Sequence, residues 1–233
     1  MCLVVEGQRL PASARKIDRK LGGFLSDKVK LSDFKGGFGK TVLVDTPGDF
    51  NTKTVVLLGL GYKENFGSLE AFRAANIAVA RTGQRSRTVS VDFSSVDRGF
   101  LKVFLEGMAC GTYEYGKLKS SGKKKNRIER ICIASRRISA DYFSTEAAHA
   151  SAVSKSVALS RDLVNDPPNM LTPSALAEHA LSISEGSEHL SCRVLDREEI
   201  RQMGMGGLSA VSFGSSEPPR LSLIHISEPT RPY

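Results

Sequence analysis

Two short segments contain residue types that bind phosphate in other proteins. Gly36 to Thr41 reads GGFGKT, and Asp45 to Gly48 reads DTPG. A phosphate loop brings backbone amides, a lysine and a threonine to the phosphates and their magnesium ion. It also needs a glycine at the position of Phe34, must follow a strand and must open a helix. GGFGKT instead precedes the strand-like run TVLVD, so the pattern favours a flexible turn over a GTPase site.

A third glycine segment, GLG at Gly59 to Gly61, ends a strand-like run and precedes a helical pattern. This is half of a dinucleotide-binding fingerprint, but the third glycine and the matching acidic residue are not in place. The segment predicts a tight strand-to-helix turn.

The histidines and cysteines show no spacing typical of a metal site or a nucleophilic triad. Each histidine is predicted to be an ordinary helix or tail residue, and each cysteine a small core residue in a reducing compartment. The sequence therefore predicts no catalytic, metal-ligating or cofactor-binding residue in this chain. The residues considered are His149, His179, His189, His225, Cys2, Cys110, Cys132 and Cys192.

The net charge of +8 is partly concentrated between Lys117 and Arg137, which hold nine Lys and Arg residues and a single acid, Glu129. Such a stretch can attract polyanions, but it lacks interleaved aromatic residues for base stacking. A solvated hairpin tip between two strands is the favoured interpretation, and weak polyanion or nucleic-acid binding is the alternative. The residues that would carry that binding are Lys117, Lys119, Lys123, Lys124, Lys125 and Arg127.

Short β-branched runs alternate with helical patterns over the first part of the chain. This alternation predicts a largely parallel α/β layer. The expected strands are 2–6, 41–45, 54–60, 87–93 and 128–134, and the expected helices are 13–21, 68–82 and 96–111. No apolar run reaches the roughly 20 residues of a membrane span, and the start lacks a signal-peptide pattern, so a cytoplasmic protein without membrane contact is expected.

A long helical pattern from Thr145 to Val164 follows, and the prolines after Asn165 must end it. Thr172 and Pro173 are typical of the cap and first turn of a new helix. Leu190 to Val194 alternates as a strand, and Asp196 with Glu199 resembles a capping box. A second α/β domain therefore begins near residue 165.

The same residues resemble a known family. SRDLVNDPPNMLTPSALAEHA, followed by CRVLDREEIRQMGMGGLSAVSFGSSEPPRL, is similar to the start of the catalytic domain of the leucine aminopeptidase (cytosol aminopeptidase) family. EGQRLPASARKIDRKLGG and KTVVLLGLGYKENF resemble, more loosely, that family's N-terminal domain, a macro-domain-like α/β layer. The resemblance covers residues 1 to 220.

This resemblance implies a metallo-exopeptidase that removes N-terminal residues from peptides, forms a homo-hexamer when intact and uses two divalent ions, Zn or Mn. The family's metal ligands lie in motifs similar to VGKGITFDSGG and NTDAEGR, and neither motif occurs here. No family residue is therefore carried over. The chain is expected to be a catalytically incompetent fragment that binds no metal.

The last residues, LSLIHISEPTRPY, depart from the family pattern. LSLIHISEPTR, Leu221 to Arg231, resembles a translated sequencing-library adapter, and the alternative is a native strand, LSLIHI, followed by a proline-containing tail. The expected organisation is an N-terminal macro-like domain (1–143), a linking helix (144–165), an incomplete catalytic domain (166–220) and a non-native tail (221–233). Two functions remain open: a fragment of an aminopeptidase, or a macro-like binding module for a phosphorylated ligand or nucleic acid.

Overall fold

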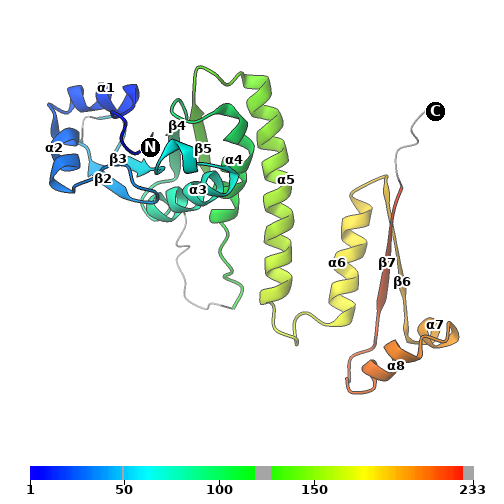
Figure 1. The fold of residues 1–233 in the computed structure, drawn as a ribbon. Coiled ribbons are helices and arrows are strands. Elements are labelled where there is room, and N and C mark those ends of the chain that lie inside the picture. Colours follow the sequence, from blue (N-terminus) through cyan, green and yellow to red (C-terminus); the bar gives the residue numbers. More distant parts are fainter. Residues whose placement is uncertain (49, 119–126, 228–233) are drawn as a thin grey trace, which may run out of the picture. The chain divides into compact units, whose positions relative to one another are not determined.

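Figure 1 shows the fold in a computed structural model, which describes residues 1–48, 50–118 and 127–227. The chain divides into two compact units, Met1–Arg161 and Asp162–Tyr233. Unit 1 contains a mixed sheet, and unit 2 contains an antiparallel pair of strands. Over the described residues, no helix is both long and apolar enough to span a bilayer.

The sheet of unit 1 has the strand order β2-β3-β1-β4-β5. β1 pairs in parallel with β3 and β4, and β4 pairs in parallel with β5, whereas β2 runs antiparallel to β3. β3 is buried along its length after Thr54, as is typical of a strand covered on both faces. The strands are β1 Cys2–Val4, β2 Thr41–Asp45, β3 Thr54–Gly59, β4 Thr88–Asp92 and β5 Arg130–Ala134.

Helices cover both faces of this sheet (Figure 1). α1 and α2 contribute Ala14 and Leu25 to a core on one face, and α3 and α4 contribute Ala75 and Phe104 to a core on the other. The predicted α/β layer is confirmed, and α2 is an addition to the predicted helices. The helices are α1 Ala12–Lys20, α2 Phe24–Leu31, α3 Ser68–Thr82 and α4 Leu101–Gly111, with 3-10 turns at Lys63–Asn65 and Arg98–Phe100.

The long helix α5, Ala140–Asn165, is attached to unit 1 over most of its length. Its first turns pack on the same core as α3 and α4, through Tyr142, Phe143, Ala147 and Ala150. Near its end, the Arg161 guanidinium donates to the Cys110 carbonyl oxygen (3.2 Å) and lies 5.3 Å from the centre of the Tyr113 ring. The helix ends at Asn165, as the following prolines predict, and starts five residues before the predicted Thr145.

Unit 2 is a small layer in which α6 packs on the antiparallel pair β6 and β7. Its apolar residues that are buried in the described part of the chain are Ala177, Ala180, Leu195, Ile200 and Pro219. β7 is the strand that the native alternative for Leu221 to Ile226 predicts, and α8 is an unpredicted helix. The elements are α6 Pro173–Glu185, β6 Leu190–Leu195, α7 Arg197–Gln202, α8 Gly206–Ser212 and β7 Leu221–Ile226.

Local capping defines the helices of unit 2. The Thr172 hydroxyl accepts a hydrogen bond from the Ala175 amide (3.2 Å), with Pro173 in the first turn. Asp196 accepts from the amide of Glu199 (3.0 Å), whose carboxylate in turn accepts from the Asp196 amide (3.0 Å). Both predicted caps are confirmed, because each depends on residues that are adjacent in the sequence.

Candidate functional site

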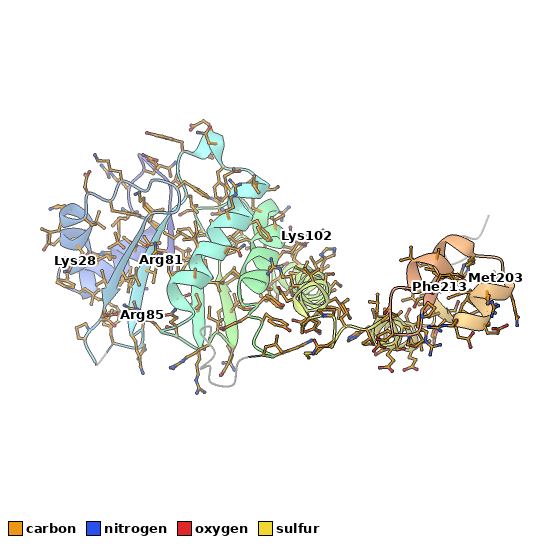
Figure 2. All side chains as sticks on the ribbon, turned by 90° about the horizontal axis from the view of Figure 1, so that it is seen from below. Lys28, Arg81, Arg85, Lys102, Met203 and Phe213 are labelled. Carbon is orange, nitrogen blue, oxygen red and sulfur yellow. The ribbon has the colours of Figure 1, made fainter. Side chains whose placement is uncertain are left out.

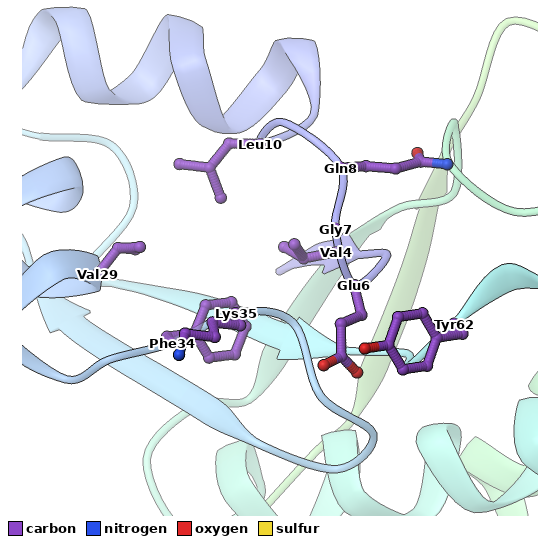
Figure 3. Close-up of a pocket in the computed structure, with 9 residues that line it drawn as sticks. All are labelled: Val4, Glu6, Gly7, Gln8, Leu10, Val29, Phe34, Lys35 and Tyr62. Atoms are coloured by element: carbon purple, nitrogen blue, oxygen red, sulfur yellow. The ribbon is translucent and has the colours of Figure 1, made fainter.

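A cavity of about 410 Å³ opens at the carboxyl ends of β1 and β3 (Figure 3). After β1 the chain forms α1 and α2, which cover one face of the sheet, and after β3 it forms α3, which covers the other. Because the chain goes to one face of the sheet after β1 and to the other face after β3, a crevice forms at this edge. Open parallel sheets bind their ligands in such a crevice. The fold therefore makes this cavity the first candidate site of unit 1.

The polar lining of this carboxyl-edge cavity comes from three loops. Glu6 and Gln8 follow β1, Lys35 precedes the glycine-rich turn, and Tyr62 follows β3. In Figure 3 the Glu6 carboxylate and the Tyr62 hydroxyl point toward each other. One carboxylate and one ammonium give the lining no net charge, and the Lys35 ammonium lies 3.3 Å from Asp33. The apolar lining residues are Val4, Leu10, Val29 and Phe34.

The two glycine-rich segments of unit 1 contact each other beside this cavity. The Gly39 amide donates to the Gly59 carbonyl oxygen (2.9 Å), and the Gly61 amide donates to the Gly36 carbonyl oxygen (2.9 Å). Gly36, Gly39 and Gly61 have positive φ angles, which glycine adopts without strain. GGFGKT leads into β2 and opens no helix, so the predicted turn is confirmed. These glycines allow close backbone packing.

Two buried cysteines lack the character of nucleophiles. Burial raises the pKa of the thiols of Cys2 and Cys110 above the ordinary value, because the thiolate loses solvation. Both side chains are buried, whereas Cys132 and Cys192 are partly exposed. A raised pKa keeps a thiol protonated at neutral pH, so Cys2 and Cys110 are core residues of the kind the sequence predicts.

The described residues contain no group of three His, Cys, Asp or Glu side chains that could hold a metal ion. His149 Nδ1 lies 3.4 Å from Glu106 Oε1, which is an ion pair between α5 and α4 when the histidine is protonated. His225 lies on β7 opposite Ser191. The two divalent ions that the family resemblance implies therefore find no ligand set in this part of the chain.

The basic stretch is described at its two ends. Lys117 and Arg127 are exposed, and the Arg127 amide donates to the Gly83 carbonyl oxygen at the end of α3 (2.6 Å). The stretch begins after α4 and includes β5. Residues 112–118 form no strand, so the prediction of a hairpin tip between two strands is wrong. The other residues expected to bind polyanions lie outside the described residues: Lys119, Lys123, Lys124 and Lys125.

The segment from Ser160 to Pro173, which carries the resemblance, joins α5 to α6. The amides of Met170 and Leu171 both donate to the Pro167 carbonyl oxygen (2.8 and 2.9 Å), which closes the turn after the prolines. Arg220 Nε, just before β7, donates to Ser174 Oγ at the start of α6 (3.4 Å). Among the described residues, this segment forms the turn between the two helices, and the start of α6 anchors the residue before β7.

Comparison with known proteins identifies the chain. A family model described as "Cytosol aminopeptidase family, N-terminal domain" matches residues 2–122, which is more than half of the chain. The chain belongs to the cytosol aminopeptidase family. The model of that family's catalytic domain matches residues 158–231, so the two matches follow each other in the predicted order. The resemblance given by the sequence is confirmed.

Curated bacterial relatives match nearly the whole chain. It is 28% identical over 231 residues to "Probable cytosol aminopeptidase" of Pseudomonas aeruginosa, a match that covers 96% of this chain and 47% of that protein. It is 30% identical over 229 residues to the protein of the same name from Azotobacter vinelandii, a match that covers 95% of this chain and 46% of that protein. The chain therefore spans about half the length of the curated relatives that it matches.

Solved structures of aminopeptidase relatives share the fold. A tomato leucine aminopeptidase variant superposes with a TM-score of 0.85 at 24% identity, covering 99% of this chain and 48% of that one. The bottromycin maturation enzyme BotP in complex with Mn superposes with a TM-score of 0.72 at 24% identity. The match covers 96% of this chain and 44% of that one. At this identity the likeness shows the fold alone. It places both units in the mixed α/β architecture of this family's first half.

The catalytic-domain match extends to residue 231 and so includes β7. These are residues that the sequence assigns to an adapter-derived tail. The family match and the adapter origin are competing accounts of Leu221 to Arg231, and the adapter origin stays a prediction.

Proposed function

We propose that residues 1–220 are the N-terminal domain and the first part of the catalytic domain of a two-metal aminopeptidase, which removes N-terminal residues from peptides. The observation that carries this proposal is the pair of family matches in order along the chain. The tomato leucine aminopeptidase fold, which spans 99% of the chain, supports it. Peptide substrates, a homo-hexamer and a cytoplasmic location belong to the same proposal for the intact enzyme.

In this proposal, the ligands of the two metal ions lie outside the described residues. Two divalent ions would polarise the scissile carbonyl and activate a water in the intact enzyme. The described residues supply no group of three ligands for either ion. We infer that the ligands follow Arg220 in the natural protein, and that the 233-residue chain alone has no peptidase activity.

A binding module for a phosphorylated ligand is the other function that the sequence leaves open. The carboxyl-edge cavity is where such a ligand would bind in a fold of this topology. Its lining has one cationic and one anionic side chain, Lys35 and Glu6, and so provides no excess of positive charge for phosphate. The charge of this cavity favours a small neutral guest over a phosphorylated one.

The natural reading frame tests the proposal. We expect the genomic sequence to continue past Arg220 with an apolar strand and then a segment rich in lysine and aspartate, in place of LSLIHISEPTRPY. Sequencing the source gene across the codons for Pro219 to Tyr233 decides this. A natural frame that encodes the present tail and stops there would contradict the aminopeptidase proposal and favour a binding module.

A further inference from the structure

A second cavity of unit 1, about 660 Å³ in volume, lies toward the amino ends of the parallel strands. Its floor is the face of the sheet beside α1, with Val55 of β3 and Ser90 of β4, and α1 contributes Ser13 and Ile17 to its wall. It shares no described lining residue with the carboxyl-edge cavity. Its volume is within the range of small-ligand sites.

Cationic side chains from four separate segments line this amino-edge cavity. Lys53 comes from the turn between β2 and β3, Arg81 from the last turn of α3, Arg85 and Arg87 from the connection to β4, and Arg127 from the segment before β5. Figure 2 labels Arg81 and Arg85, together with Lys28 and Lys102, two cations that do not line the cavity. Charges from segments so far apart in sequence converge here only because the sheet brings them together.

Carboxylates only partly neutralise this lining. Asp92 is the acidic residue among the described lining residues, and it accepts a hydrogen bond from the Ser13 hydroxyl. At the rim, Asp45 lies 3.7 Å from Arg85, and Glu129 lies 3.6 Å from Arg87. Five cationic side chains against these three carboxylates, two of them outside the lining, leave an excess of two positive side-chain charges among the described residues.

Lys53, Arg81 and Arg127 supply this excess. None of the three has a carboxylate within ion-pair distance in the described part of the chain. The negative end of the α3 dipole accounts for a cation at Arg81, but not for Lys53 or Arg127, which lie on other segments. Backbone bonding fixes two of these segments, since the Arg127 amide donates to Gly83 (2.6 Å) and the Arg85 amide donates to Thr82 (3.0 Å).

The rest of the lining defines the class of ligand. Hydroxyl groups surround the cations, and the described lining has no aromatic side chain on which a nucleobase could stack. We propose that the amino-edge cavity binds a small anion that carries several phosphate groups and no nucleobase. Arginine and lysine from different segments would each contact a different phosphate group. The hydroxyl-bearing residues of the described lining are Ser13, Thr52, Thr54, Thr82, Ser86, Thr88 and Ser90.

Calorimetric titration of the 233-residue chain with inorganic tripolyphosphate tests this proposal. We expect one saturable site at low salt, weakened as added NaCl screens the charges, and much weaker binding of single phosphate. The double variant Arg81→Gln, Arg127→Gln should lose about tenfold or more in affinity, because two charge-assisted contacts are removed. The matched control Lys28→Gln, Lys102→Gln removes the same charge elsewhere and should stay within about twofold of the unchanged chain.

A second variant, Lys53→Gln, and a second probe, a single-stranded oligonucleotide, complete the binding test. Lys53→Gln lies in an exposed turn, and it should weaken binding by about threefold or more even if the double variant fails to fold. The proposal is overturned if tripolyphosphate gives no saturable binding, or if both double variants lose affinity equally. It is also overturned if a single-stranded oligonucleotide binds more tightly than tripolyphosphate, since the cavity would then belong to a nucleic-acid surface.

Discussion

Gly59→Ala should lower the free energy of unfolding of unit 1 by more than any conservative substitution on the surface of that unit. A Cβ at Gly59 would lie 2.1 Å from the Gly37 carbonyl oxygen and 2.6 Å from the Gly36 carbonyl carbon, which are backbone atoms of the neighbouring turn. The turn would have to move away and give up its hydrogen bonds to Gly59 and Gly61. We expect the free energy of unfolding to fall by about 3 kcal/mol and the Tm by roughly 6 to 12 °C.

Thermal melts followed by tyrosine fluorescence measure this effect. The chain has no tryptophan, and four of its five tyrosines lie in unit 1, so the signal reports mainly on that unit. Gly48→Ala is the matched control, because its Cβ would meet nothing within 4 Å and its φ is not positive. The control should stay within about 0.5 kcal/mol of the unchanged chain. Equal Tm values for the two variants would refute the close contact between the glycine segments.

Limited proteolysis should remove unit 2 at least about tenfold faster than it cuts unit 1. A single two-stranded sheet is marginally stable, and the apolar residues buried in the described part of unit 2 are only Ala177, Ala180, Leu195, Ile200 and Pro219. Large apolar side chains stay exposed there, including Met203 and Phe213 (Figure 2), with Phe213 85% exposed. The same exposed surface should make the chain prone to self-association.

Mass spectrometry of thermolysin digests identifies the cuts. The resistant fragment should extend to about Arg161, beyond the predicted boundary at residue 143, because α5 packs on the core of unit 1 and Arg161 is bonded to Cys110. The urea-unfolded chain is the control, and both units should then be cut at similar rates. Native cleavage within Met1–Arg161 as fast as within Asp162–Tyr233 would contradict this account.

Local sequence chemistry predicted much of the fold. The two helix caps at Thr172 and Asp196 and the end of α5 before its prolines depend on a few adjacent residues, so their patterns suffice. The strands of unit 1 were equally predictable from their β-branched runs. α2 was missed because it is only eight residues long and follows Gly22 and Gly23, and α8 because it begins with Gly206 and Gly207.

The sites depend on tertiary structure and were much less predictable. No sequence pattern near Gly59 predicts that the backbone of Gly37 lies against it. The amino-edge cavity gathers Lys53, Arg81 and Arg127, and the sequence alone does not show that these segments meet. One local signal was available: Arg81 to Arg87 reads RTGQRSR, a cluster of arginines between a helix and a strand.

We propose that this chain is the first part of an aminopeptidase and that the metal ligands lie outside it. The most direct test is hydrolysis of leucine p-nitroanilide by the purified 233-residue chain with added Mn²⁺ or Zn²⁺, and with EDTA as the control. We predict no turnover above the buffer rate with either ion, and no rise in Tm. Turnover that requires the metal and disappears with EDTA would contradict the claim.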